Sequence, residues 1–508
     1  MAKSDVLSQL GTGPASLPGT ATYPSRREFL QQATWGFGMA ALAVLLDQER
    51  AWSQEATAGG SIPADLRPRP GHFPPKATSV IMLMQVGGPS QIELFDPKPE
   101  LQKRHGQVYQ ADVEVLQPGS ESKKLMAGLF PFHHRGQCGM EISELLPHIG
   151  SIADEVCLVR SMYSDHNNHP QATRALLGGK IFPGRPSVGS WISYALGTEN
   201  QNLPAYVVLR DPTGYNNGGT TMWENGWLPA LFRGTEIQSR GAAVLDLHPA
   251  VALPDGMQQN TLEVLAGLNE EHRRLYPRES DLDARIRNYE LAARMQLNAE
   301  KVLDISCESA TTRRLYGLDD PVTENFGTRC LMARRLVESG VRFVQVLVPI
   351  AAGTNTWDHH EKLKSGLEAV CPQVDRPSAA LILDLKRRGL LDTTIVLWTG
   401  EFGRLPISQH GNGRDHNRHA FSLILAGGGF KSGYVHGRTD ELGYKAVEGR
   451  VSTPDLLATI LNQLGLDHDR LKYRHQGREE SLTDSAVTHA RVVHELLDTP
   501  AGDPSRRA

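Results

Sequence analysis

Acidic residues and histidines gather in three segments of this chain, and each segment follows a short apolar run. After the run 156–162 come Asp165, His166 and His169. After the run 341–348 come Asp358, His359 and His360. After the run 394–398 come Glu401, Arg404, Asp415 and His416. Carboxylates and neutral imidazoles bind divalent cations such as zinc, manganese, calcium or iron, so these residue types could build a metal site.

The predicted metal ligands come from the second and third of these segments. Asp358 and His360 are two residues apart, a spacing that lets both bind one ion. Glu401 and His416 complete the predicted set. Asp415 precedes His416 directly, so we expect one of the two to face the ion while the other supports it from behind.

Two arginines are candidates for pairing with an anionic group of a substrate, namely Arg404 and Arg174. A plainer interpretation of all these residues stays open. The chain has 19 histidines, and Asp and His are common in solvated loops, so some clustering arises by chance. A metal site is therefore a hypothesis that depends on the structural context.

Six apolar runs are predicted to be buried strands, and helical patterns separate most of them. The runs are 79–86, 156–162, 205–210, 341–348, 394–398 and 421–426. Helices that alternate with continuously apolar strands indicate an α/β fold, in which a mainly parallel central sheet is flanked by helices on both faces. Because ligands of such sheets bind outside the carboxyl ends of the strands, we expect the polar segments to meet at one edge.

The chain is predicted to carry one large domain between two terminal extensions. The expected segments are a signal region 1–53, a linker 54–76, a single domain 77–485 with a helical cap insertion at about 215–310, and a tail 486–508. The net charge of −4 gives no electrostatic reason to expect nucleic acid as a partner.

The N-terminal segment resembles a twin-arginine export signal. Arg26 and Arg27 precede a Phe-Leu pair, the apolar run 33–46 and small residues, in that order. The run is shorter than the ~20 residues of a membrane-spanning helix, and we expect no stable membrane span. An amphipathic N-terminal helix is the alternative. The export interpretation predicts a periplasmic or extracellular protein.

Long motifs of the chain resemble the domain-of-unknown-function 1501 family. They are GGPSQIELFDPKPEL, GRPSVGSWISYALGTENQNLPAYVVL, CLMARRLVESGVRFVQV, WDHH, GEFGRLP, GRDHNRHAFSLILAGGG and PDLLATILNQLGLD. These are secreted bacterial proteins, often called sulfatase-like. The resemblance implies an alkaline-phosphatase-like fold and an active site with one or two divalent metals at the C-terminal edge of the sheet.

The resemblance also implies roles for single residues. In TGEFG, Glu401 stands at the metal-binding acid of sulfatases, and Phe402 replaces the histidine that follows it. Asp358 with His360, and the later His416, look like superfamily metal ligands. HPQATRALLGG resembles the nucleophile segment and puts His169 at the nucleophile position, with His166 near enough in sequence to assist. No acid ends the first strand and no formylglycine precursor motif is present, which departs from the sulfatase pattern.

We therefore predict an exported metal-dependent hydrolase that acts on sulfate or phosphate esters of a small molecule or a polysaccharide. His169, His166 and Arg404 are the predicted catalytic residues. The alternative is a non-catalytic, metal-bearing binding protein for sulfated glycans, with a degenerate site.

Overall fold

The computed structural model describes residues 65–211, 219–239, 254, 256–276, 280–348 and 357–498. The predicted signal region 1–53 lies outside the described residues, as do the predicted linker up to residue 64 and the predicted tail after residue 498. Among the described residues, no helix is both long enough and apolar enough to cross a membrane.

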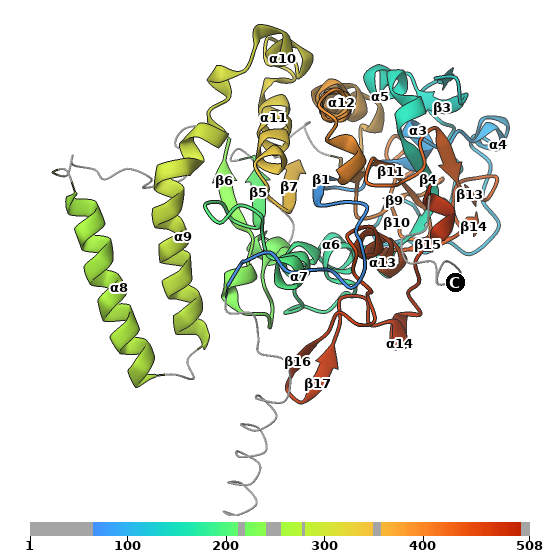
Figure 1. Ribbon diagram of the computed structural model, residues 1–508. Coiled ribbons are helices and arrows are strands. Elements are labelled where there is room, and N and C mark those ends of the chain that lie inside the picture. The colour runs from blue at the N-terminus through green and yellow to red at the C-terminus, as the bar shows by residue number, and fades with distance from the viewer. Residues whose placement is uncertain are drawn as a thin grey trace, which may run out of the picture. The chain divides into compact units, whose positions relative to one another are not determined.

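A nine-stranded sheet forms the centre of the fold (Figure 1). Its strands are β1 (Ser79–Gln85), β4 (Cys157–Tyr163), β5 (Tyr206–Arg210), β6 (Thr235–Gln238), β7 (Phe343–Val348), β8 (Thr394–Thr399), β11 (Phe421–Ala426), β12 (Tyr434–His436) and β15 (Val451–Ser452). The order is β12-β4-β11-β8-β1-β7-β5-β6, and β15 also pairs with β4. β11 is antiparallel to β4 and β8, whereas the other pairs are parallel.

The mainly parallel sheet and its six predicted strands are confirmed. In β1, for example, all seven residues are buried, because helices cover both faces of the sheet. The three strands that the sequence did not indicate, β6, β12 and β15, are short and lie at or near the edges of the sheet. Their residues lack the long apolar run that marks a central strand.

Helices flank the sheet on both sides (Figure 1). α11 (Glu324–Glu338) and α12 (Leu363–Arg387) lie on one side, and α6 (His169–Gly178), α7 (Val188–Leu196) and α13 (Thr453–Gln463) lie on the other. α8 (Met257–Leu275) and α9 (Ser280–Leu303) fall in the predicted cap segment, and α9 contacts α11. A continuous hydrophobic core joins the sheet to its covering helices.

Shorter elements complete the described chain. They are α3 (Gln91–Leu94), α4 (Pro99–Lys103), β2 (Phe132–Arg135), β3 (Met140–Ser143), α5 (Pro147–Ser151), α10 (Ala310–Leu315), β9 (Gly403–Arg404), β10 (His416–Asn417), β13 (Arg438–Thr439), β14 (Ala446–Glu448), β16 (Tyr473–His475), β17 (Arg478–Glu480) and α14 (Ser485–Thr488).

The predicted bounds of the terminal extensions are wrong. Leu66, from the predicted linker, is buried in the core, and the backbone N–H of Arg69 donates to the carbonyl of Leu196. Leu496 and Leu497, from the predicted tail, are also buried, and Leu497 forms a β-bridge with Phe430. The domain is therefore longer at both ends than the prediction 77–485.

The direction of the strands explains where polar residues can meet. β1, β4, β7 and β8 run the same way, so their C-terminal ends lie at one edge of the sheet. Because β11 runs the opposite way, the segment before it reaches the same edge. β10, just before β11, pairs there with β9, so that His416 lies opposite Arg404.

Candidate metal centre

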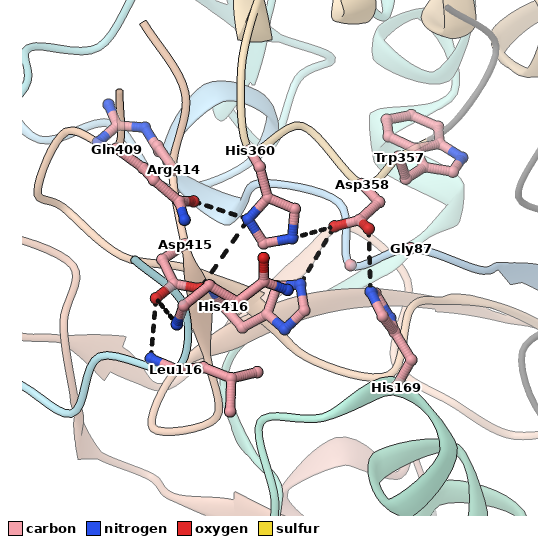
Figure 2. A network of polar contacts seen from close by, with 12 residues as sticks. Gly87, Leu116, His169, Trp357, Asp358, His360, Gln409, Arg414, Asp415 and His416 are labelled. Atoms are coloured by element: carbon pink, nitrogen blue, oxygen red, sulfur yellow. Dashed lines mark hydrogen bonds and ion pairs between the residues drawn. The ribbon is translucent and has the colours of Figure 1, made fainter. Parts of the chain in front are cut away.

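The carboxylate of Asp358 lies among three histidine rings at this edge (Figure 2). Its Oδ1 is 2.9 Å from Nε2 of His360 and 3.1 Å from Nε2 of His416. Its Oδ2 is 3.3 Å from Nε2 of His169. One ligand atom each from His169, Asp358 and His416 can be chosen so that all lie within 4.8 Å of one another. The Asp358 and His360 side chains keep 22% and 19% of their surface exposed, so the centre is open to solvent.

The proton position on the His416 ring is fixed by a backbone carbonyl. Nδ1 of His416 lies 2.7 Å from the carbonyl oxygen of Asn167. A carbonyl oxygen only accepts hydrogen bonds, so Nδ1 must carry a proton and donate it. In the neutral ring, Nε2 then presents its lone pair to Asp358.

The His360 ring is fixed in the same way through an amide side chain. Nε2 of Gln409 donates to the carbonyl of Pro118 at 2.8 Å, which turns Oε1 of Gln409 toward His360. Oε1 lies 2.7 Å from Nδ1 of His360, so Nδ1 is again the donor. When the His360 ring is neutral, its Nε2 therefore faces Oδ1 of Asp358 with a lone pair.

Two lone pairs aimed at one carboxylate oxygen repel it unless a cation or protons intervene. Burial, with the nearby Arg404 charge, lowers the pKa of His416 to about 3, so this ring does not take up a proton near neutral pH. Burial works to raise the pKa of Asp358, but the Arg404 guanidinium and the hydrogen bond from His169 hold it well below its usual range. Two ligands of one zinc ion, each about 2.1 Å from it, lie ~3–3.4 Å apart. The residues present therefore fit a divalent cation.

His169 and Glu401 form a buried pair beside these ligands. Nδ1 of His169 lies 2.5 Å from Oε1 of Glu401, and Glu401 also accepts the backbone N–H of Gly87 at 2.9 Å. Burial alone would lower the pKa of His169, but Asp358 and Glu401 together raise it to about 9. Because Glu401 holds Nδ1, Nε2 is the atom of His169 that faces the centre.

Glu401 thus takes a different place from the one predicted for it. Its side chain is fully buried behind His169, where its oxygens accept hydrogen bonds from His169 and Gly87. A carboxylate in this position orients the imidazole and raises its basicity. Of the predicted four-residue set, Asp358, His360 and His416 lie together, with His169 on the far side of the Asp358 carboxylate.

Arg404 is not placed to meet a substrate, contrary to its predicted catalytic role. Its side chain has no exposed surface, and its guanidinium donates to Oδ1 of Asp358 at 2.7 Å and to four backbone carbonyls. The carbonyls are those of Gly87, Gly88, Trp357 and Arg414. Arg404 therefore ties the loops after β1, β7 and β8 together and fixes Asp358.

Asp415 supports the centre and does not face it. Its Oδ1 accepts the backbone N–H of His416 at 2.8 Å, and its Oδ2 accepts those of Leu116 and Gln117. Both oxygens of Asp415 thus accept hydrogen bonds from backbone donors, and the residue has no exposed surface. Of the adjacent pair, His416 faces Asp358 and Asp415 holds the backbone of His416 in place (Figure 2).

His166 lies in the loop before α6, and its ring forms a hydrogen bond within that loop. Its Nδ1 accepts the backbone N–H of Asn168 at 3.0 Å. No contact between His166 and Asp358, His360 or His416 is found in the described part of the chain. The structure therefore gives no support to the predicted catalytic role of His166.

Sequence reasoning missed the residues that fix the rings and the loop. Asn167 acts through its backbone carbonyl, which no sequence pattern reveals, and Gln409 is an ordinary loop residue until its neighbours are known. Gly87 did leave a signal in the motif GGPS. Its φ is +121°, and a Cβ there would come within 2.9 Å of the Asp358 backbone nitrogen, so only glycine lets the two loops approach.

Residues 77–497 match a family model described as "Protein of unknown function (DUF1501)". No curated protein matches the chain. The chain is similar to several solved structures, of which three follow. Ps i-CgsB in complex with k-i-k-neocarrahexaose is 11% identical over 82% of this chain and 78% of that chain, with a TM-score of 0.36.

The phosphonate monoester hydrolase SpPMH from Silicibacter pomeroyi is 11% identical over 82% of this chain and 77% of that chain, with a TM-score of 0.32. A protein in the alkaline phosphatase superfamily from Vibrio parahaemolyticus is 11% identical over 80% and 71%, also with a TM-score of 0.32. Likenesses of this size carry no argument about fold, substrate or reaction.

Proposed function

We propose that this chain, which belongs to the DUF1501 family of proteins of unknown function, is a metal-dependent hydrolase that acts on sulfate or phosphate esters. One observation carries the proposal. The Nε2 atoms of His360 and His416, each with its Nδ1 proton donated elsewhere, converge on the same oxygen of Asp358. The ester class rests on the sequence resemblance described above.

Asp358, His360 and His416 would hold the ion in this proposal. When bound, a divalent cation supplies Lewis-acid chemistry at an ester oxygen. Asn167 and Gln409 keep the two rings in the tautomer that binds a metal, and Arg404 keeps the Asp358 carboxylate ionised and in place.

His169 is proposed to move the proton. Its Nδ1 is held by Glu401, so Nε2 is the only ring atom that can give a proton to a leaving oxygen or take one from water. The raised pKa of about 9 keeps this ring protonated near neutral pH in the absence of the ion. The pair therefore suits general acid catalysis beside the metal ligands.

The proposal is tested with chromogenic sulfate and phosphate esters and protein loaded with zinc, manganese, calcium or iron. We expect metal-dependent hydrolysis, and we expect His169→Ala to lower kcat by about 10²–10⁴-fold while the bound metal stays near the wild-type level. The matched control is His166→Ala, three residues away, which should keep kcat within about 3-fold.

Two results would contradict these roles. If His169→Ala loses as much metal as a ligand variant, His169 holds the ion and is not a proton carrier. If metal-loaded protein hydrolyses no ester, the second candidate function is favoured. This function is a metal-bearing binding protein for sulfated glycans. That candidate is favoured by one feature, the histidine at the start of α6 in place of a serine, threonine or cysteine nucleophile.

We also propose export by the twin-arginine route, with a periplasmic or extracellular location. Replacing Arg26 and Arg27 by lysine should leave the precursor in the cytoplasm, because the export pathway reads the arginine pair itself. Cell fractionation followed by immunoblotting measures this. Arg67→Lys, a change outside the signal, is the control, and unchanged export of the double variant would reject the route.

A further inference from the structure

A pocket lies along the α6 helix, beside the candidate metal centre. The residues that bear on its chemistry are Pro170, Thr173, Arg174, Phe182, Met222 and Glu224. One side is apolar, and Phe182 leaves 61% of its surface exposed there. The polar side is formed by α6 and by the short segment around Glu224.

Among the residues that the structure describes, two polar groups of α6 in this pocket have no hydrogen-bond partner. The Thr173 hydroxyl is buried and forms no hydrogen bond, although the residue is only 2% exposed. Nε of Arg174 is likewise buried without a hydrogen bond. Within the described ranges, no carboxylate forms an ion pair with Arg174. Buried donors without partners cost free energy, so a group that accepts from both would be stabilised here.

The second arginine of the pocket, Arg185, already forms hydrogen bonds within the protein. Its Nε donates to the carbonyl of Gly178, and one terminal nitrogen donates to the carbonyls of Ser481 and Leu482. Its guanidinium also stacks over the ring of Trp227 at 5.0 Å. Arg185 is therefore part of the wall, and Arg174 is the cation that remains available.

The pocket is close to the centre along the same helix. His169 is the first residue of α6, and Pro170, which follows it, lines the pocket. Thr173 comes four residues after His169, which places it on the same helical face about 6 Å farther along the axis. A ligand about one sugar ring long could reach from the pocket to the side of His169.

We propose that the α6 pocket binds a second oxyanion of the substrate, a sulfate, phosphate or carboxylate group other than the ester that is cleaved. This inference rests on the proposed function and names its substrate class, esters that carry an additional negative charge. The guanidinium of Arg174 matches the two oxygens of such a group, and the Thr173 hydroxyl supplies a third donor. Glu224 also lines this pocket, and its carboxylate repels an anion. We therefore expect the anion to bind on the α6 side of the pocket.

The test uses inorganic sulfate as the probe and the full metal-loaded chain, by calorimetric titration at constant ionic strength. We expect Arg174→Gln to weaken sulfate binding by about 10- to 100-fold and Thr173→Val to weaken it by about 3- to 10-fold. The matched control is Arg438→Gln, because Arg438 is a surface arginine with 70% side-chain exposure, and this change should have no effect.

Metal content is measured on the same samples, which separates the two proposals. If Arg174→Gln weakens sulfate binding and leaves the metal content unchanged, the result supports an oxyanion site in the α6 pocket. This holds whatever the ester assay shows for the proposed hydrolase activity. Unchanged sulfate binding in Arg174→Gln places the anion elsewhere, for instance at the metal, and overturns the inference. The inference is also overturned if the wild-type protein binds no sulfate.

Discussion

Replacing His416 by alanine is expected to lower the affinity of the protein for zinc by more than about 100-fold. The ring supplies an Nε2 lone pair that is fixed toward Asp358 by the carbonyl of Asn167. Even residues that only support metal ligands change affinity by ~10- to 100-fold when replaced, so loss of a ligand should exceed that range. Competition with a chromophoric chelator and metal analysis of protein purified without chelators measure the change.

A graded series makes this prediction sharper. His360→Ala should behave like His416→Ala. Gln409→Met removes the acceptor that fixes His360 and the donor to the Pro118 carbonyl, and it should lower zinc affinity by about 10- to 100-fold. His419→Ala is the control, because His419 lies three residues from His416 but bonds to Glu114 on the surface. Equal metal content across the series would show that no ion binds at Asp358.

The fold was predictable because its central strands are buried on both faces. In such strands nearly every residue is apolar, as in β1 and β8, and the signal needs no knowledge of the neighbours. The start of α12 was not predictable in this way. Pro372 and Pro377 lie inside this helix, and proline normally marks a helix end, so the local sequence does not indicate one continuous helix. Tertiary packing holds the helix together where its local sequence does not.

The candidate site was partly predictable for a related reason. The rule that ligands bind at the carboxyl ends of parallel strands indicated the loops of Asp358, His360 and His416. The rule predicts which loops line the site, but it does not predict the direction in which a side chain of such a loop points. Glu401 and Arg404 follow the same strand end, yet one lies behind His169 and the other is buried among backbone carbonyls. Such assignments depend on contacts between segments hundreds of residues apart.

Replacing Arg404 by methionine is expected to destabilise the domain by about 3–5 kcal/mol, the usual cost of removing one partner of a buried ion pair. The variant leaves the Asp358 carboxylate without its cation and four backbone carbonyls without their donor. Methionine fills most of the space, so the loss reports on charge and hydrogen bonds more than on a cavity. Urea unfolding followed by circular dichroism and by tryptophan fluorescence measures the change, and coincident transitions justify a two-state free energy.

Two further variants separate the effect of charge from that of geometry. Arg404→Lys keeps the charge but has three donors on a flexible stem, so it should recover only part of the stability. Arg438→Met removes a surface arginine with 70% side-chain exposure and should change stability by less than about 0.5 kcal/mol. Because Arg404 also fixes Asp358, Arg404→Met should weaken zinc binding by about 10- to 100-fold, whereas Arg438→Met should not. A variant of Arg404 that unfolds like the wild type would mean that the loops at this edge of the sheet are held by other contacts, and that Arg404 does not position the centre.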